Sequence, residues 1–510
     1  MIRRGSIVTQ GKPDKDKQDK GTSPENTPGD AKREKNPKKA TVPFEFSPQE
    51  YPPDTYPIPS VELGRPPVSD QLYVGFCSID EVPNELFEKY DVKRGLRNAD
   101  GSGVLVGLTT ISNVHGYNKV NGKLVPDKGD LIYRGYHIDD LVSHPQEEDR
   151  FGYEEIAYLL IAGALPTQDQ LDDFNARIDS RRLLPEDFFY HFPPKTQSHS
   201  IMNIMARSTL MLYAFDKTPD DISPTHEVDV AISMLARLPR IATIAHALYQ
   251  AKKDDTKLLV PPPREGYSMA ESVLDVLRGD EGFTHEEAMM LDIMLMLHAE
   301  HGGGNNSTFS CRVLSSSNTD AYSAYAAAMG SLKGPRHGGA NTKVGYMVDD
   351  IANHVKDWDN EDEIAAYLTQ IVQGKAFDHS GLIYGLGHAV YTLSDPRAQL
   401  VKRYARKLAK DKGQEDRLNL IEKIEKLGPE VMRDVKGTKK PICANIDLYT
   451  GFVYSMLGIP EDMYTPVFAI ARMAGWAAHR MEELYGANRI IRPAYNPYMP
   501  DNEYVDIKDR

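Results

Sequence analysis

The sequence has few cysteines, and none of them lies in a short Cys–Cys motif. Cys77, Cys311 and Cys443 are odd in number and far apart. This usage argues against a disulfide framework and against a structural zinc site. It is typical of a protein kept in a reducing compartment.

Long hydrophobic runs are also missing. The longest, Met289–Leu297, is interrupted by Asp292 and falls well short of the ~20 residues that span a membrane. The first residues contain no apolar signal core, and acidic residues such as Asp14 and Asp16 are unlike those of a mitochondrial transit peptide. These absences predict a cytoplasmic protein with no membrane segment.

The charge is acidic overall but unevenly spread. Of the 510 residues, the first 40 carry 11 Lys and Arg against 6 Asp and Glu, whereas the remainder carry 49 against 68, a net −19. An acidic body of this size argues against nucleic-acid binding. If the substrates are anions, arginines must gather locally against this field.

The chain begins with a tail and a small β region. Residues 1–68 are predicted to be a disordered or extended tail, because they are polar and Pro-rich; they could also lie along the folded body or a partner. Val104–Leu108 is predicted to be a strand, and Asn121-Gly122 predicts a hairpin. A further strand is expected over Asp130–Tyr136.

Helical periodicity dominates from residue 153 onward. We expect helices over 153–160, 167–181, 199–214, 227–251, 268–278, 288–297, 321–331, 448–457 and 464–484. Thr284 with Glu287 forms a capping box before one of them, and Asp395-Pro396 starts another. The small residues of 321–331 suit a close helix crossing or a subunit interface. The charged segment 409–441 reads as short surface helices separated by Gly413, Gly428 and Gly437.

Histidines followed by glycines recur at three places. His301, His337 and His388 each stand beside glycines, where backbone can approach a ligand. His298 and His301 could also be read as metal ligands, but they lack the HExxH order and a third ligand at a known spacing. No metal is therefore expected. The runs Gly338-Gly339 and Gly385-x-Gly387 are weak phosphate-loop signals, and they more plausibly let main chain approach a bulky ligand.

Asp447 and three arginines complete the candidate residues. Asp447 has apolar neighbours, so it is either a base of raised pKa or the N-cap of the helix that follows, and the residues alone do not decide. Arg397, Arg472 and Arg492 lie near the histidine segments. Guanidinium groups bind carboxylates through paired bonds, so these three suit a di- or tricarboxylate.

Four motifs occur in the order and at the separations of the citrate synthase family, which the sequence resembles over nearly all of residues 104–497. They are HAEHGGGNNST (298–308), LKGPRHGGAN (332–341), GLGHAVY with DPRA (385–398) and NIDLYTG (445–451). One departure is Thr392, where some members carry a basic residue, so the contacts to the CoA phosphates are left open.

The resemblance implies a mainly α, two-domain helical fold with a small N-terminal β region. It implies a tail over 1–68, a large helical domain over 69–338 and a small domain over 339–448 that closes over the substrates. Residues 449–510 would return to the large domain and form a C-terminal arm. A homodimer or higher homo-oligomer is expected, with Arg492 reaching the neighbouring subunit's site.

The resemblance also implies roles for each residue in condensing acetyl-CoA with oxaloacetate, with no cofactor. Asp447 would remove a methyl proton, His337 would stabilise the enolate, and His388 would donate to the oxaloacetate carbonyl. Substrate binding would fall to a further set of residues, His301, Arg397, Arg472 and Arg492. The rival hypotheses are a 2-methylcitrate synthase that uses propionyl-CoA, a catalytically silent homologue with a structural or regulatory role, and a metal-binding protein centred on His298 and His301.

Overall fold

The computed structural model describes residues 82–188, 198, 200–253, 262–438, 440–487, 489–499 and 501–509. The tail expected over residues 1–68 lies outside the described residues, as does Cys77.

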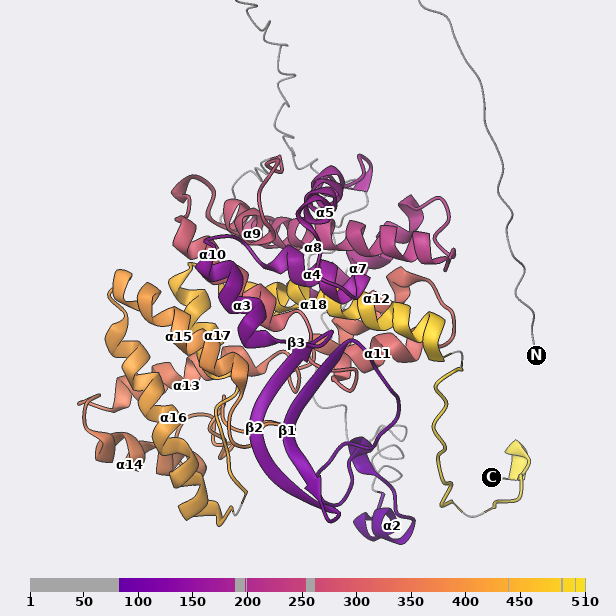
Figure 1. Ribbon diagram of the computed structural model, residues 1–510. Coiled ribbons are helices and arrows are strands. Elements are labelled where there is room, and N and C mark those ends of the chain that lie inside the picture. The colour runs from indigo at the N-terminus through magenta and orange to yellow at the C-terminus, as the bar shows by residue number, and fades with distance from the viewer. Residues whose placement is uncertain are drawn as a thin grey trace, which may run out of the picture. The chain divides into compact units, whose positions relative to one another are not determined.

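Helices account for most of the described chain (Figure 1). The first group comprises α2 (Asn84–Lys89), α3 (Ile138–Glu147), α4 (Tyr153–Ala162), α5 (Gln168–Arg181), α7 (Ile201–Leu212), α8 (Pro224–Lys253) and α9 (Met269–Arg278). The second comprises α10 (His285–His298), α11 (Asn306–Ser315), α12 (Ala321–Leu332), α13 (Ala340–His354) and α14 (Glu361–Val372). The last comprises α15 (Pro396–Asp411), α16 (Glu415–Lys436), α17 (Asp447–Met456) and α18 (Tyr464–Glu482). The prediction of a mainly α fold is confirmed.

A single three-stranded antiparallel sheet forms the predicted N-terminal β region. Its order is β1 (Ser112–Val120), β2 (Lys123–Tyr133) and β3 (Tyr136–His137). Asn121 and Gly122 both have positive φ, +49° and +77°, in the two-residue turn between β1 and β2. The hairpin prediction is therefore confirmed, because only such residues adopt this turn readily.

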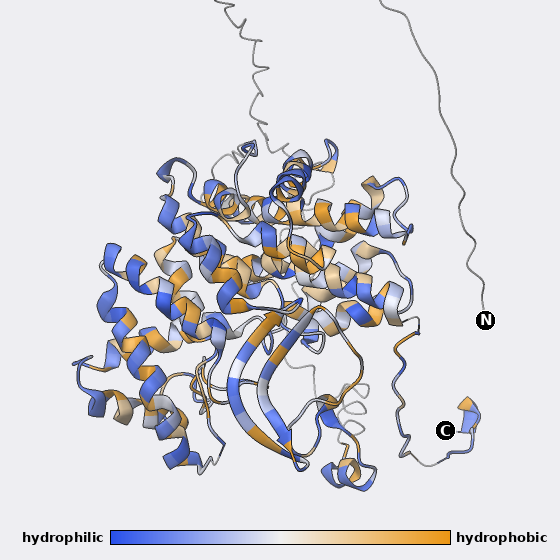
Figure 2. Cartoon of the chain, in the orientation of Figure 1, coloured by the Kyte–Doolittle hydropathy of each residue, from blue (hydrophilic) through white to orange (hydrophobic). Residues whose placement is uncertain are grey.

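α18 lies in the middle of the helical core. It packs against α4, α8, α10, α11 and α12, and Figure 1 shows it crossing the centre of the fold. α10 is buried from Glu287 to His298, as expected of a helix that is apolar nearly all round. Figure 2 shows hydrophobic residues on the inward faces of these helices.

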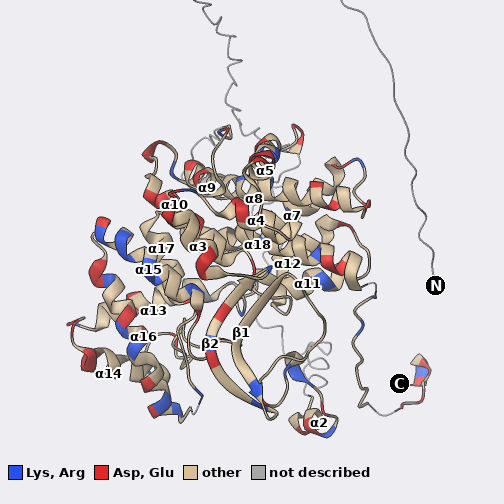
Figure 3. Ribbon diagram, in the orientation of Figure 1, with Lys and Arg blue, Asp and Glu red and all other residues tan. Residues whose placement is uncertain are grey.

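Charged residues are frequent on three helices in the second half of the chain. Figure 3 shows Lys, Arg, Asp and Glu along α14, α15 and α16. α15 and α16 are joined by ion pairs such as Lys402–Glu425 at 2.8 Å. Ion pairs that solvent still reaches add little stability, so the buried faces of these two helices, with Leu400, Leu420 and Ile424, hold α15 and α16 together.

Two element predictions are wrong. Val104–Leu108 is not a strand: Leu105 and Leu108 are 86% and 87% exposed, so this apolar stretch has no surface to pack on within the described chain. Segment 409–441 is not a set of short helices, because α16 runs unbroken across Gly428 and Pro429. A side chain at Gly428 would collide with Leu386, so close packing of α16 on that loop explains the glycine.

The expected helix of small residues is α12, which packs closely on α7 and α11. This supports the interpretation of a tight crossing within the core. Its alternative place at a subunit interface stays a prediction, as does the division into a large and a small domain.

Candidate active site

Hydrogen bonds join the loop that carries His388 to the segment that precedes Asp447. The Gly387 amide donates to the Cys443 carbonyl at 2.8 Å, and the Asn445 side chain donates to the Gly387 carbonyl at 2.8 Å. Gly385 has φ +83°, and a Cβ there would lie 2.9 Å from the Leu448 Cα. Glycine is therefore required at Gly385 for the loop to lie against the start of α17.

His388 lies at the centre of this arrangement. Its Nδ1 accepts hydrogen bonds from the Val390 and Tyr391 amides, both at 3.1 Å, so the ring proton is on Nε2. That nitrogen is 3.1 Å from Nε2 of His301, which must then accept and carry its own proton on Nδ1. The Nδ1 of His301 is buried without a hydrogen-bond partner among the described residues, so a donor is left for a ligand oxygen.

Both imidazoles are held neutral. Burial lowers the pKa of His388 to about 4, and the nearby Arg397 charge adds to the effect. Burial also holds the pKa of His301 well below its usual range, again with Arg397 contributing. At neutral pH this pair is therefore uncharged, and its N–H on Nδ1 of His301 is left for a ligand.

The two buried arginines differ in how they are satisfied. Arg397 is bound by Asp395 in two contacts, Nε to Oδ1 at 3.0 Å and Nη2 to Oδ2 at 2.7 Å. Arg472 donates through Nε to the His298 carbonyl at 2.7 Å. Its two terminal nitrogens are buried with no partner among the described residues. Burial lowers the pKa of Arg472 to about 10, and the nearby Glu300 carboxylate opposes this effect, so Arg472 remains a cation. No carboxylate forms an ion pair with its terminal nitrogens among the described residues.

Asp447 is the first residue of α17, and the N-cap position belongs to Ile446. The N-cap interpretation of Asp447 is therefore wrong. Burial raises the pKa of the Asp447 carboxyl to about 6, opposed by the charge of Arg397 and supported by that of Asp395. A carboxylate of this pKa is ionised at neutral pH and is a stronger base than an exposed aspartate.

His337 is held by a residue from another segment, Asn305. Its Nε2 lies 3.1 Å from Oδ1 of Asn305, the residue that precedes α11, and Asn305 also accepts from Ser307 at 2.9 Å. With the amide oxygen facing the ring, Nε2 carries the proton; with the amide turned over, the proton would be on Nδ1. Burial lowers the pKa of His337 to about 4, with Arg472 adding to the effect.

Six of the seven predicted site residues are thus linked by contacts or by electrostatic effects on one another's pKa. They are His301, His337, His388, Arg397, Arg472 and Asp447. Arg492 is the exception. It is exposed in the stretch after α18, and no contact joins it to the other six within the described part of this single chain. Nothing here tests its expected place in a neighbouring subunit.

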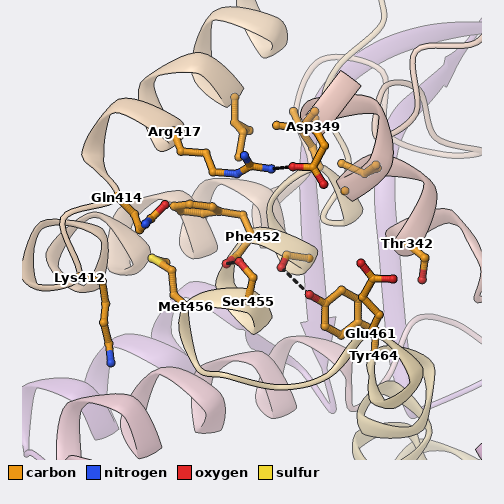
Figure 4. A pocket seen from close by; sticks show the side chains of 16 residues that line it. Thr342, Asp349, Lys412, Gln414, Arg417, Phe452, Ser455, Met456, Glu461 and Tyr464 are labelled. Atoms are coloured by element: carbon orange, nitrogen blue, oxygen red, sulfur yellow. Dashed lines mark hydrogen bonds and ion pairs between the residues drawn. The ribbon is translucent and has the colours of Figure 1, made fainter. Parts of the chain in front are cut away.

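A cavity of about 510 Å³ lies around another side of α17 (Figure 4). Its walls include Leu448, Phe452 and Met456, and its two basic side chains are already paired with carboxylates, as Figure 4 shows for Arg417 and Asp349. None of the seven predicted residues lines it. A space whose cations are already paired does not suit a carboxylate substrate, so the histidine–arginine cluster is the better candidate site.

The family that matches this sequence is described as "Citrate synthase, C-terminal domain", and it matches residues 99–494. The chain belongs to the citrate synthase family. This confirms the resemblance that the four motifs indicated. Members of the family are transferases that act on acyl groups.

Relatives with two different names are similar to this chain. The citrate synthase of Deinococcus radiodurans is 35% identical over 359 residues, which are 70% of this chain and 88% of that protein. The 2-methylcitrate synthase 1 of Corynebacterium glutamicum is 33% identical over 429 residues, 82% of this chain and 98% of that protein. Family membership therefore leaves the acyl group open.

Solved structures agree with the fold. One is a ternary complex of citrate synthase from Thermoplasma acidophilum with carboxymethyl coenzyme A and oxaloacetate. It has a TM-score of 0.66 and 26% identity and covers 82% of this chain and 99% of that one. The citrate synthase of Pyrobaculum aerophilum has a TM-score of 0.65 at 26% identity, covering 80% and 94%.

Two further findings concern the described residues alone. No group of three or more His, Cys, Asp or Glu side chains there could hold a metal ion. Within the same residues, no helix is long and apolar enough to cross a membrane.

Three residues with clear structural roles escaped the sequence interpretation. Asn305 holds His337, Asp395 pairs with Arg397, and Tyr391 packs on His388. All three stand inside the family motifs, and the sequence assigns a role only to Asp395, as a helix cap. Their proximity to the histidines was the missing signal, and it exists only in the folded chain.

Proposed function

We propose that this protein is a citrate synthase that condenses acetyl-CoA with oxaloacetate and hydrolyses the citryl-CoA formed to citrate and CoA. The observation that carries the proposal is the unpaired, buried guanidinium of Arg472 beside a neutral histidine pair. A dicarboxylate would satisfy that cation, and the Nδ1 proton of His301 would find an oxygen acceptor. The ternary complex of the Thermoplasma relative contains oxaloacetate and a coenzyme A derivative, which supports this substrate pair.

The chemistry begins at Asp447. Its carboxylate takes a proton from the methyl carbon of the acetyl thioester, and the resulting negative charge moves to the thioester oxygen. His337 stabilises that oxygen through its Nδ1 proton, which requires the Asn305 amide to present its nitrogen to Nε2. Both groups act without a metal or other cofactor.

The new carbon–carbon bond forms when the enolate carbon attacks the ketone carbon of oxaloacetate. His388 donates its Nε2–H to the ketone oxygen, which takes that proton and becomes the hydroxyl of citryl-CoA, and water returns a proton to the ring. Water then cleaves the thioester and releases CoA. Arg397, Arg472 and His301 hold the carboxylates throughout, and Arg492 of a second copy completes the site, so the functional unit is a homodimer.

The proposal includes the setting of the enzyme. Residues 339–448 form a small domain that closes over the substrates and excludes water until condensation is complete. The enzyme works in the cytoplasm and its reaction is that of the tricarboxylic acid cycle.

The acyl group decides between this function and its nearest alternative, 2-methylcitrate synthase, which the similarity to the Corynebacterium enzyme favours. One methylene changes preference by only about 1–3 kcal/mol in an apolar pocket, so the test must be direct. Release of CoA thiol is measured with acetyl-CoA and with propionyl-CoA, each with and without oxaloacetate. Faster oxaloacetate-dependent release from acetyl-CoA is expected.

Faster release from propionyl-CoA would replace the proposal with the 2-methylcitrate function. No release from either thioester would leave the fold and family intact and favour a silent homologue with a structural or regulatory role.

A further inference from the structure

An aromatic ring that the catalytic scheme does not use lies against the catalytic histidine. Tyr391 is 1% exposed, and its ring stacks on the His388 imidazole with centroids 4.6 Å apart and planes inclined by 21°. The same ring lies 5.7 Å from the His301 ring and 5.8 Å from the Arg397 guanidinium carbon. One side chain thus touches three members of the predicted site.

The other end of this tyrosine is anchored in the β-hairpin. Its hydroxyl donates to the Asp130 carbonyl of β2 at 3.3 Å. The hairpin backbone also packs closely against the loop that carries His388 and Tyr391. A Cβ at Gly116 would lie 2.7 Å from the Val390 carbonyl oxygen, and one at Gly129 would collide with the Ser394 carbonyl and touch the tyrosine ring. The loop and the hairpin therefore pack closely together beside Tyr391.

We propose that Tyr391 is a positioning residue that clamps the His388 imidazole against the β-hairpin and keeps water from its face. The clamp fixes the direction of the Nε2 proton that His388 delivers to the ketone oxygen, so the inference rests on the proposed function. The stacked ring, rather than the hydroxyl, does this, because the Asp130 bond is long and holds only the far end of the side chain.

A purely structural role would predict a different set of effects. If Tyr391 only filled space, replacing it with an apolar side chain of similar size would lower stability but leave the behaviour of His388 unchanged. A clamp that excludes water predicts instead that His388 gains a proton more easily once the ring is gone. The imidazolium form has a proton on Nδ1 and loses its bonds from the Val390 and Tyr391 amides, so it is also misplaced.

The groups around His388 set the direction of that change. Burial lowers its pKa to about 4, Arg397 and Arg97 lower it further, and Asp395 opposes them. The neutral His301 is its remaining close titratable partner. Water admitted by loss of the ring weakens the burial effect, so the pKa of His388 rises towards its ordinary value. Protonation of His388 then adds to that of Asp447, whose pKa of about 6 already sets the acid limb of the pH–rate profile, so this limb becomes steeper and moves up.

The test compares three substitutions in the full-length protein. Tyr391→Phe keeps the ring and loses the hydroxyl, whereas Tyr391→Leu and Tyr391→Met lose the ring and keep apolar volume. We expect kcat to fall less than about threefold in the first and between about tenfold and a hundredfold in the others. The KM for acetyl-CoA should change little, and the acid limb should rise only in the variants without a ring.

Tyr367→Leu is the matched control. Tyr367 also stacks on a histidine, His354, with centroids 5.1 Å apart and planes inclined by 13°, and neither residue belongs to the site. This control should leave kcat and the pH profile unchanged while removing the same type of contact. Urea unfolding of every variant separates loss of folding from loss of positioning.

A second readout needs no activity. NMR titration of the His388 ring, assigned with His388→Asn, should show a higher pKa in Tyr391→Leu and Tyr391→Met than in the wild type. An unchanged titration and pH profile would overturn the inference, as would an equal loss of kcat in Tyr391→Phe. If the wild type releases no CoA at all, the proposed function fails, but the titration still tests the clamp on His388.

Discussion

Arg472 and Asp447 show how single residues in this fold are kept in states that folding alone does not favour. Arg472 is a buried cation with two nitrogens lacking partners, and Asp447 is a carboxylate whose pKa is raised to about 6. Each costs stability in the protein, and the proposed function accounts for each of them by a substrate that it would contact. Strain of this kind is typical of functional sites.

Replacement of Arg472 should separate stability from function. Arg472→Met removes two unsatisfied buried nitrogens but also the bond to the His298 carbonyl and the attraction to Glu300, so we expect the free energy of unfolding to change by less than about 1 kcal/mol in the absence of substrate. Oxaloacetate binding should be lost. Urea unfolding and calorimetric titration with oxaloacetate measure the two effects. A large loss of stability would mean that the guanidinium is satisfied by the fold itself.

Asp447→Asn should abolish turnover while leaving oxaloacetate binding nearly intact, because the carboxylate acts on the other substrate. The stability of the variant should also depend on pH differently from that of the wild type. The folded pKa of Asp447 lies above its unfolded value, so the wild type loses stability as pH rises from about 4 to about 7, and the amide does not. The variant should thus gain stability over the wild type across this range. Near-normal turnover would make the assignment of the base wrong.

At the scale of elements, the loop from Gly385 to Asp395 brings the catalytic histidine to α17. The fit depends on Gly385, whose φ is positive and whose missing side chain leaves room for Leu448. Gly385→Ala should therefore cost more than about 2 kcal/mol of stability and lower activity, since strain and a backbone clash add.

Gly413→Ala is the control for that substitution. Gly413 also has a positive φ, +63°, between α15 and α16, but nothing lies within 4 Å of its missing Cβ. Its alanine variant should lose only about 1 kcal/mol and keep full activity. Equal effects of the two substitutions, measured by urea unfolding and CoA release, would show that the contact with Leu448 is unimportant.

Local signals predicted the elements well where the chemistry is local. The capping box of Thr284 and Glu287 and the Asn121-Gly122 turn each act over a few residues, and both are present in the structure. Val104–Leu108 failed because apolar alternation needs a partner strand or a core to pack on, and neither can be read from five residues. Helix α16 passes through Gly428-Pro429 because its packing on Leu386 outweighs the local cost.

The same limit applies to the site. Six of the predicted residues came together, and five of them lie inside the four motifs on which the resemblance rested, with Arg472 outside them. Asn305, Asp395 and Tyr391 support those side chains through contacts between segments that are distant in the chain or through ring stacking. These supporting contacts can be identified only from the folded structure, in which the loop, the hairpin and the start of α11 lie close together.

At the scale of the whole molecule, the proposed function requires a residue from a second copy of the chain. Arg492 lies exposed beyond α18, away from the cluster of six. The proposal of a shared site predicts complementation between two inactive variants, Asp447→Asn and Arg492→Ala. When equal amounts are mixed and reassembled, heterodimers have one intact site, so about a quarter of the wild-type activity should return. No recovery, despite heterodimers being detected, would contradict a contribution from the second copy.

The most direct test of the account is the fate of an isotope-labelled methyl group in acetyl-CoA, followed by NMR with the full-length protein and oxaloacetate. The account predicts that the label appears in a methylene carbon of citrate with an equal amount of free CoA, and that Asp447→Asn forms neither. Label found in acetate, or CoA released without oxaloacetate, would contradict condensation at this site and indicate simple thioester hydrolysis instead.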